Sequence, residues 1–244
     1  MKRIVCFSTG NTYQFRTSIN KDIEICLKTG ADGIEVVFPF VKDLMKFKLT
    51  KENKKGLMKL KYNTVHMPFF DKNKNQLYLF NTPRCKKIVE KAYKLAKDIN
   101  AININFHPNQ MKNPKVLDGF EDMGFTLENL TEKRGYTVTD YKKMLKKESK
   151  FDFLLDTSHA IRTNQMKTLI DNLKDKIKFI HLSGAKGLRD DHYLVYRFKH
   201  KNRKQLDLIK KLKCPVIIEA GKDKDLTVKD FKKEVKYVRK WLNS

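Results

Sequence analysis

The stretch "FDFLLDTSHA", residues 151–160, begins as a buried strand and ends with an acid and a histidine. Its continuous apolar run is typical of a strand in a parallel sheet, where both faces are covered. Asp156 and His159 then follow three residues apart, and both side chains are costly to bury without a partner. Two interpretations are open here: a capped turn with a hydrogen-bonded carboxylate, or a metal or catalytic site.

Short apolar runs of the same kind recur along the chain and alternate with helical patterns. Eight such runs are the number that a (β/α)8 TIM barrel needs. An open doubly wound sheet shows the same alternation, but its nucleotide-binding fingerprints, GxGxxG and GxxxxGK[ST], are absent. We therefore expect an α/β protein whose eight parallel strands close into a barrel with outer helices. The runs are "RIVCFS" from Arg3, "GIEVVF" from Gly33, "YNTVHMPF" from Tyr62, "AININFH" from Ala101, "FTLENL" from Phe125, "FDFLLD" from Phe151, "IKFIHL" from Ile177 and "PVIIEA" from Pro215.

Amphipathic periodicity predicts helices over residues 84–99 and 227–242, with Thr227 as an N-cap. The segment 108–124 contains Pro and Gly and permits at most a short helix. No linker rich in Pro, Gly or Ser divides the 244 residues, so we expect a single TIM-barrel domain over residues 1–244.

The four cysteines are scattered and form no CxxC pair, which predicts reduced thiols in a cytoplasmic protein. The first residues hold too short an apolar run for a signal peptide, and no later run is long enough for a membrane helix. We expect a cytoplasmic monomer that does not bind a membrane.

The formal net charge is +25, from 53 Lys and Arg against 28 Asp and Glu. Such a field attracts polyanions, and nucleic acid is the obvious candidate. Lysine-rich surfaces also arise from genome composition or thermophily, however, and the excess here is mostly Lys spread along every helix. Charge alone therefore favours a nucleic-acid partner only modestly.

Histidines and carboxylates gather at the ends of the last six predicted strands. In a TIM barrel all these carboxyl-terminal ends meet at one mouth. Imidazoles and carboxylates crowded there need a divalent metal to neutralise the carboxylates and use the imidazole lone pairs. Nine such groups exceed the ligands of one tetrahedral site, so we expect more than one ion. The candidate ligands are His66, His107, Glu128, Asp156, His159, His181, Asp190, His192 and Glu219.

The motifs "VHMPF", "FHP", "LEN", "LLDTSHA", "IHL", "DDH" and "IIEA" follow one another in order over roughly residues 60–220. In this order and placement the chain resembles the endonuclease IV family of apurinic/apyrimidinic endonucleases, within the xylose isomerase-like TIM barrel superfamily. The resemblance implies two or three Zn2+ ions per chain, with Mn2+ or Mg2+ as further options. It implies three groups of ligands: His66, His107 and Glu128; Glu128, Asp156, His181 and Glu219; and His159, Asp190 and His192.

The activity that the resemblance implies is base-excision repair of damaged double-stranded DNA. A hydroxide bridging the metal ions would attack the phosphodiester on the 5′ side of an abasic site, and Glu128 or Glu219 would orient it. Phe69 and Phe70 match the pair that enters the base stack, although capping the barrel core is the commoner role for such residues. On this interpretation Asp156 and His159 belong to neighbouring metal sites, and only Thr157 and Ser158 remain for a capped turn.

A metal-dependent sugar isomerase or epimerase of the same superfamily is the alternative. Glu128, Asp156, His181 and Glu219 would then hold one Mn or Mg ion while two carboxylates move protons at a carbinol carbon. The segment "DGIEVV", with Glu35 inside a strand, is typical of these enzymes. The extra histidines and the high positive charge favour the nuclease. A barrel that binds nucleic acid or metal without turnover is a third, weaker hypothesis.

Overall fold

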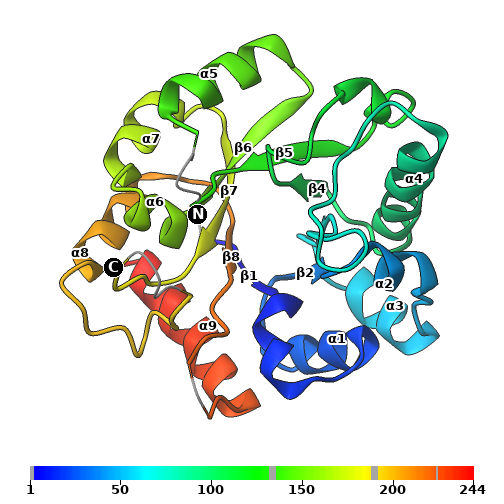
Figure 1. The fold of residues 1–244 in the computed structure, drawn as a ribbon. Coiled ribbons are helices and arrows are strands. Elements are labelled where there is room, and N and C mark those ends of the chain that lie inside the picture. The colour runs from blue at the N-terminus through cyan, green and yellow to red at the C-terminus, as the bar shows by residue number, and fades with distance from the viewer. Residues whose placement is uncertain (1–2, 132–135, 188–191, 224) are drawn as a thin grey trace.

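Eight parallel strands close into a barrel in the computed structural model, which describes residues 3–131, 136–187, 192–223 and 225–244 (Figure 1). Each strand pairs with the next one along the chain, and the last pairs with the first. The predicted (β/α)8 TIM barrel is therefore confirmed, and every predicted run coincides with one strand, although β5 begins one residue before its run. The strands are β1 (Val5–Ser8), β2 (Gly33–Val37), β3 (Thr64–His66), β4 (Asn103–Phe106), β5 (Gly124–Glu128), β6 (Phe151–Asp156), β7 (Ile177–Leu182) and β8 (Val216–Ile218).

Helices surround the barrel on its outside (Figure 1). The two predicted amphipathic helices are present, and segment 108–124 contains only the short 3-10 helix η2, as expected. The α-helices are α1 (Ile19–Leu27), α2 (Val41–Lys46), α3 (Lys51–Met58), α4 (Pro83–Asp98), α5 (Val138–Lys147), α6 (Thr157–Arg162), α7 (Met166–Leu173), α8 (Arg203–Leu206) and α9 (Val228–Leu242). The 3-10 helices are η1 (Thr9–Phe15), η2 (Pro114–Leu117) and η3 (Asp207–Lys211). In the described ranges, no helix has both the length and the apolar composition needed to cross a membrane.

Hydroxyl side chains begin several of the helices that cover the barrel. Thr82 accepts the backbone N–H of Cys85 at the start of α4, where Pro83 occupies the first turn. Thr227 begins α9 and forms a reciprocal capping box with Asp230, which confirms the predicted N-cap. These caps satisfy backbone N–H groups that would otherwise lack partners, and they leave the apolar faces of the helices to pack on the sheet.

A small apolar cluster fills the lower part of the barrel interior. Because strand side chains alternate between faces, the residue two positions further along each strand also points inward, one layer higher. Asp156, His181 and Glu219 occupy those positions, each two residues after a member of the cluster. The barrel therefore carries an apolar floor with polar side chains above it. The cluster consists of Cys6, Leu154, Phe179 and Ile217.

Helix α9 carries a buried carboxylate that holds the segment following His192. Glu234 is fully buried and accepts the backbone N–H groups of Val195 at 2.7 Å and Tyr196 at 2.9 Å. Burial raises the pKa of Glu234 to about 7, and the two N–H groups act in the opposite direction. Glu234 thus fastens the connection after β7 to the carboxyl-terminal helix.

We expect this carboxylate to make folding stability depend on pH. The folded chain binds the Glu234 proton more tightly than the unfolded chain, so the contribution is complete below pH 4.5 and is lost as the pH rises through about 7. Relative to the Glu234→Gln variant, the free energy of unfolding of the wild type should fall by roughly 3 kcal/mol across this window. Urea unfolding at a series of pH values measures the difference.

Glu52→Gln is the matched control, because Glu52 is an exposed glutamate of α3. Its unfolding free energy should stay within about 1 kcal/mol of the wild type across this window, because Glu52 lies in the first turn of α3. Equal pH dependence in the wild type and Glu234→Gln would contradict the assignment.

Candidate metal centre

Eight of the nine predicted ligands lie in the described part of the chain, and all eight meet at the carboxyl-terminal mouth of the barrel. His66, Glu128 and Asp156 are the last residues of β3, β5 and β6, and His181 lies one residue before the end of β7. His107 and Glu219 directly follow β4 and β8. Asp190, predicted as a ligand beside His159 and His192, lies outside the described residues.

Three groups of side chains place their possible ligand atoms within 4.8 Å of one another. Two of them coincide with the groups expected from the sequence. The third contains Asp156, which therefore takes part in two groups, as does Glu128. The groups are His66, His107 and Glu128; Glu128, Asp156, His181 and Glu219; and Asp156, His159 and His192.

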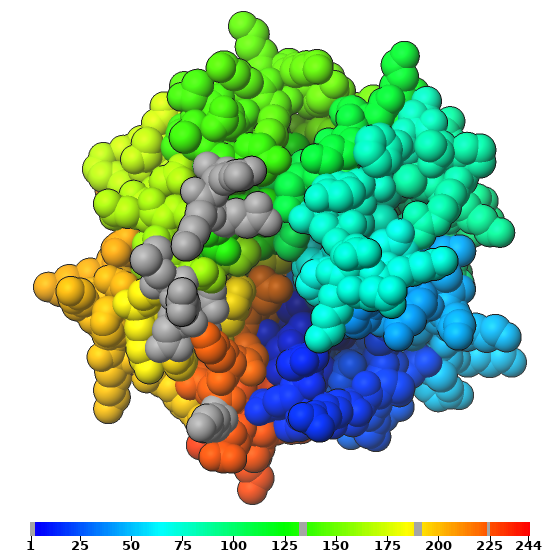
Figure 2. Space-filling model, viewed as in Figure 1, coloured from blue at the N-terminus to red at the C-terminus, as the bar shows by residue number. Residues whose placement is uncertain are grey.

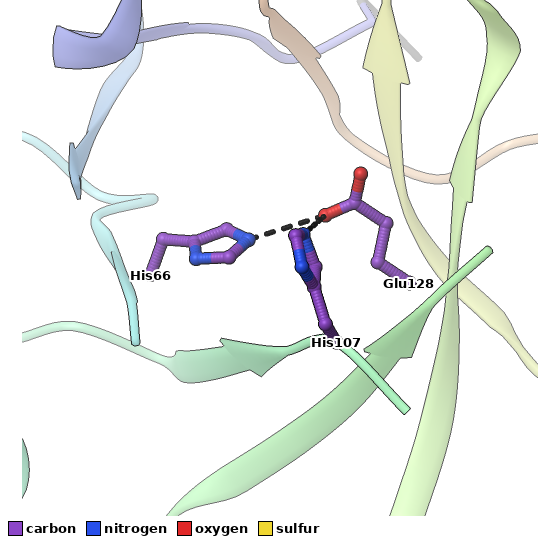
Figure 3. A group of neighbouring side chains, drawn as sticks. All are labelled: His66, His107 and Glu128. Atoms are coloured by element: carbon purple, nitrogen blue, oxygen red, sulfur yellow. Dashed lines mark hydrogen bonds and ion pairs between the residues drawn. The ribbon is translucent and has the colours of Figure 1, made fainter. Parts of the chain in front are cut away.

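The first group converges on one carboxylate oxygen. His66 Nε2 lies 3.2 Å from Glu128 Oε2, and His107 Nε2 lies 3.6 Å from the same atom. Figure 3 shows the two rings approaching this oxygen from different strands. In the central group, His181 Nδ1 lies 2.8 Å from Glu219 Oε2 and 3.5 Å from Glu128 Oε2. The carboxylate of Glu128 thus joins the two groups.

Asp156 corrects one expectation from the sequence. The capped turn was assigned to Thr157 and Ser158 alone, but Asp156 is itself the N-cap of α6. Its Oδ1 accepts the backbone N–H of His159 at 2.6 Å and the hydroxyl of Ser158 at 2.9 Å. The reason is geometric: the residue that ends a strand with extended backbone can reach the third residue of the following helix. The two initial interpretations of this acid are therefore compatible, because each uses a different oxygen.

The other oxygen, Asp156 Oδ2, is buried and has no hydrogen-bond partner among the described residues. Buried carboxylate oxygens without partners are rare in native proteins because the loss of hydration is costly. Its place within two groups of imidazoles and carboxylates fits a divalent cation. Histidine nitrogens together with carboxylate oxygens, without cysteine, form a donor set that suits catalytic zinc and also admits manganese.

Two histidines each donate a ring N–H to a backbone carbonyl, and His66 turns its other nitrogen toward the site. His66 Nδ1 lies 2.8 Å from the carbonyl oxygen of Met67, and His159 Nδ1 lies 2.7 Å from that of Asn129. A carbonyl oxygen only accepts, so both Nδ1 atoms carry the proton. In the neutral ring of His66, Nε2 then presents a lone pair to Glu128 Oε2. Two acceptors at 3.2 Å repel each other unless a proton or a cation lies between them.

The electrostatics of the central group show the same need for positive charge. Burial acts to raise the pKa of Glu128, but the charge of His181 and hydrogen bonds from the surrounding histidines hold it well below its ordinary value. The same imidazole lowers the pKa of Glu219 to about 2 against the effect of burial. Burial would lower the pKa of His181, but Glu35, Glu219 and Glu128 raise it well above its ordinary range. A cation bound here would take over the charge balance and release the His181 proton.

Burial decides the direction of the pKa shift at two further residues, Asp156 and His107. It raises the pKa of Asp156 despite the nearby His159 and His192. It also lowers the pKa of His107, although Glu128 acts in the opposite direction. A neutral His107 has the protonation state that a metal ligand requires.

Phe69 and Phe70 lie beside the metal centre but differ in their surroundings. The Phe69 ring is half-buried and contacts the rings of His66 and His107, with centroids 4.8 and 5.1 Å away. Phe70 is exposed and packs on Phe40, with ring centroids 5.6 Å apart. Phe69 therefore helps to position two ligands, while Phe70 faces solvent at the mouth.

Glu35 belongs to the site, although the sequence suggested only a similarity to sugar isomerases. It is fully buried in β2, and its Oε1 accepts from His181 Nε2 at 3.1 Å and from the Asn105 amide. This contact orients the ring so that Nδ1 faces Glu128 and Glu219. A charged residue within an otherwise apolar strand was the available signal. Asn129 was also missed; its side chain pairs with both the N–H and the carbonyl of Asp156.

We expect removal of the Glu35 carboxylate to weaken metal binding. A carboxylate that orients a metal-ligating histidine typically contributes 10- to 100-fold to metal affinity. We therefore expect Glu35→Leu to weaken zinc binding by roughly that factor and Glu35→Gln to weaken it by less. Competition with a chromophoric chelator measures the dissociation constants. Glu52→Gln, which alters an exposed glutamate of α3 outside the barrel, is the control. Wild-type affinity in Glu35→Leu would show that this contact does not support a ligand.

Comparison with known proteins identifies the fold. No protein-family model matches the chain, and no curated protein matches it by sequence. Solved structures match over nearly the whole chain. A D-tagatose 3-epimerase-like protein has 19% identity and a TM-score of 0.68, covering 100% of this chain and 97% of that one. Endonuclease IV from Thermus thermophilus has 12% identity and a TM-score of 0.67, covering 98% of this chain and 99% of that one.

The IOLI protein with a bound zinc atom has 13% identity and a TM-score of 0.68, covering 99% of this chain and 98% of that one. At such identities the similarity extends to the fold alone. Epimerases stand beside endonuclease IV among these structures, so the comparisons do not single out the endonuclease IV family. The chain has the xylose isomerase-like TIM-barrel fold, with groups of side chains at its mouth that could bind metal.

Proposed function

We propose that this protein is a metal-dependent hydrolase that cleaves damaged double-stranded DNA on the 5′ side of abasic sites. One observation carries the proposal: three groups of possible ligands share Glu128 and Asp156 at one mouth. A one-metal enzyme needs only the central group of four, and has no evident use for His66, His107, His159 and His192 beside it. The fold shared with endonuclease IV and the net charge of +25 support the same activity.

Each of the three groups would hold one divalent ion, most suitably zinc. Ions bound there would supply Lewis-acid stabilisation of the phosphoryl and leaving oxygens and would lower the pKa of water. Ligand sharing through Glu128 and Asp156 keeps the three groups adjacent. The side chains would therefore surround a single phosphodiester rather than three separate ones.

Glu219 is better placed than Glu128 to orient the attacking water. The Glu219 side chain is 18% exposed at the mouth, while that of Glu128 is 2% exposed and is surrounded by four histidines. Its low pKa keeps Glu219 ionised, so its carboxylate accepts a hydrogen bond from water and aligns it. The bond to phosphorus forms as the bond to the 3′ oxygen breaks, which leaves a 3′ hydroxyl and a 5′ phosphate.

Phe70 is the residue that would enter the base stack. Its ring is exposed at the mouth and rests on Phe40. Insertion of an apolar ring opens a base step at a cost of a few kcal/mol, which contacts to the bent duplex offset. Phe69 packs on His66 and His107 and would support this ring from below.

A sugar epimerase is the second candidate, and one observation favours it. The group of Glu128, Asp156, His181 and Glu219 is by itself a complete ligand set for one ion, and solved epimerases share the fold. Glu128 and Glu219 would then move a proton at a carbinol carbon. This candidate leaves His107 and His159 without a part in catalysis.

His107→Asn and His159→Asn discriminate between the two candidates, because neither histidine belongs to the central group. For the hydrolase, each variant should lose one bound metal ion and at least roughly 100-fold in the rate of abasic-site incision. Elemental analysis of the purified protein gives the metal content, and a labelled abasic duplex gives the rate. His200→Asn, which changes the one histidine that lies apart from the site, should behave as wild type.

The outcomes separate clearly. Two or three zinc ions with incision by the wild type, and losses confined to the site variants, would support the hydrolase. One manganese ion, no incision and unchanged metal content in His107→Asn would refute it and leave the epimerase.

A further inference from the structure

A positively charged groove of about 450 Å³ lies beside the metal centre. The beginning of α2 and the connection between β3 and α4 form its walls. Four cationic side chains line it against one carboxylate, and that carboxylate, Asp71, pairs with Arg84. In Figure 2 the β3–α4 connection, in cyan, forms the surface on one side of the barrel axis. The side chains used below are Phe40, Lys42, Asp71, Lys72, Lys74 and Arg84.

Three lysines of the groove are exposed, and none of them pairs with a carboxylate within the described ranges: Lys42, Lys72 and Lys74. The Lys42 ammonium lies over the Phe40 ring, 5.1 Å from its centroid. The one carboxylate that lines the groove, Asp71, pairs with Arg84 and not with a lysine. The three lysine charges together attract an anion from outside the chain.

Hydrogen bonds hold the wall that carries two of these lysines in place. The N–H of Asp71 donates to Asn75 O, and that of Asn75 donates to Lys72 O, both at 2.8 Å, which closes a tight turn. The N–H of Phe70 donates to Pro39 O at 3.0 Å and ties this wall to the one before α2. The lysines therefore extend from a fixed backbone rather than from a loose loop.

A continuous series of ring contacts joins the groove to the metal centre. The Phe69 ring contacts His107 on one side and Phe70 on the other, with centroids 5.1 and 6.4 Å away. Phe70 in turn packs on Phe40, which lines the groove. A polymer whose reacting group lies at the histidines would thus pass over Phe70 and reach the lysines.

We propose that this groove binds the phosphate backbone of the nucleic-acid strand that flanks the reacting nucleotide. The inference rests on the proposed function. Lysine ammonium groups along an open groove suit sequence-independent contacts to successive phosphates, because they act as point charges without directional base readout. The groove therefore supplies affinity and position, while the metal centre supplies the chemistry.

The chain offers a matched control at the opposite end of the barrel. A second groove, of about 350 Å³, is lined by Lys174, Lys178 and Lys213 where β7 and β8 begin. The test variant carries Lys42→Gln, Lys72→Gln and Lys74→Gln, and the control carries Lys174→Gln, Lys178→Gln and Lys213→Gln. Both remove three exposed charges, so the net charge of the two proteins is equal. Lys178 differs from the groove lysines in that it pairs with Asp152 at 3.8 Å.

Fluorescence anisotropy with a labelled duplex carrying a stable abasic analogue measures affinity over a range of salt concentrations. For the groove variant, the slope of log K against log salt should become shallower by about 2 to 3, at roughly 0.9 for each phosphate that is no longer neutralised. The control should keep the wild-type slope, and zinc content should be equal in all three proteins. An unchanged slope in the groove variant, or an equal loss of affinity in the control, overturns the proposal.

The experiment also separates the two proposals. If the wild type incises the duplex while the groove variant binds as wild type does, only the groove assignment fails. If the groove variant loses affinity but the wild type does not incise, the groove assignment stands and the proposed hydrolysis fails. If the wild type does not bind the duplex at all, both fail.

Discussion

The metal centre depends on acceptors that lie behind its histidines. The carbonyl of Met67 takes the Nδ1 proton of His66, and the carboxylate of Glu35 takes the Nε2 proton of His181. Each ring therefore turns its other nitrogen toward Glu128. The carboxylates around His181 raise its pKa well above the ordinary range, so the proton on this ring supplies positive charge between the buried acceptors. A divalent cation would take the place of that proton, and the direction of the hydrogen bonds leaves the ring nitrogens placed to bind it.

The barrel interior supports this arrangement in layers. Above the apolar floor, a network of buried amides and hydroxyls lies beside Glu35. The Asn103 amide donates to Asn105 Oδ1 at 2.5 Å and to Thr126 Oγ1 at 2.9 Å, and the Thr126 hydroxyl donates to Asn105 Oδ1 at 2.6 Å. Asn105 then donates to Glu35. Buried polar groups are stabilising only when they are satisfied together, so this network fixes the side chains that orient the ligands.

Charge is distributed in opposite senses inside and outside the barrel. Carboxylates gather around the central histidine, whereas lysines cover the exterior and give the chain its charge of +25. The exterior field would draw a polyanion toward the protein, while the carboxylates at the mouth would repel it without bound cations. Attraction of nucleic acid and occupancy by metal would therefore act together. The same logic explains why the groove lysines lie beside the mouth rather than within it.

The barrel itself could be predicted from the sequence, because eight apolar runs separated by amphipathic helices have few other ways to be buried. The sequence also predicted that the ligands at the strand ends converge, since parallel strands end at one face. These ligands are His66, His107, Glu128, Asp156, His181 and Glu219.

Three features required the tertiary structure. Asp156 uses one oxygen as a helix cap and leaves the other for a ligand, which depends on the angle at which α6 leaves β6. Glu35 contacts a residue 146 positions away, a distance in sequence that no local pattern reports. The groove joins α2 to the β3–α4 connection, and only this packing brings Lys42 together with Lys72 and Lys74. Strand order and polarity are thus local properties of the chain, whereas the direction of each hydrogen bond is decided only when distant strands meet.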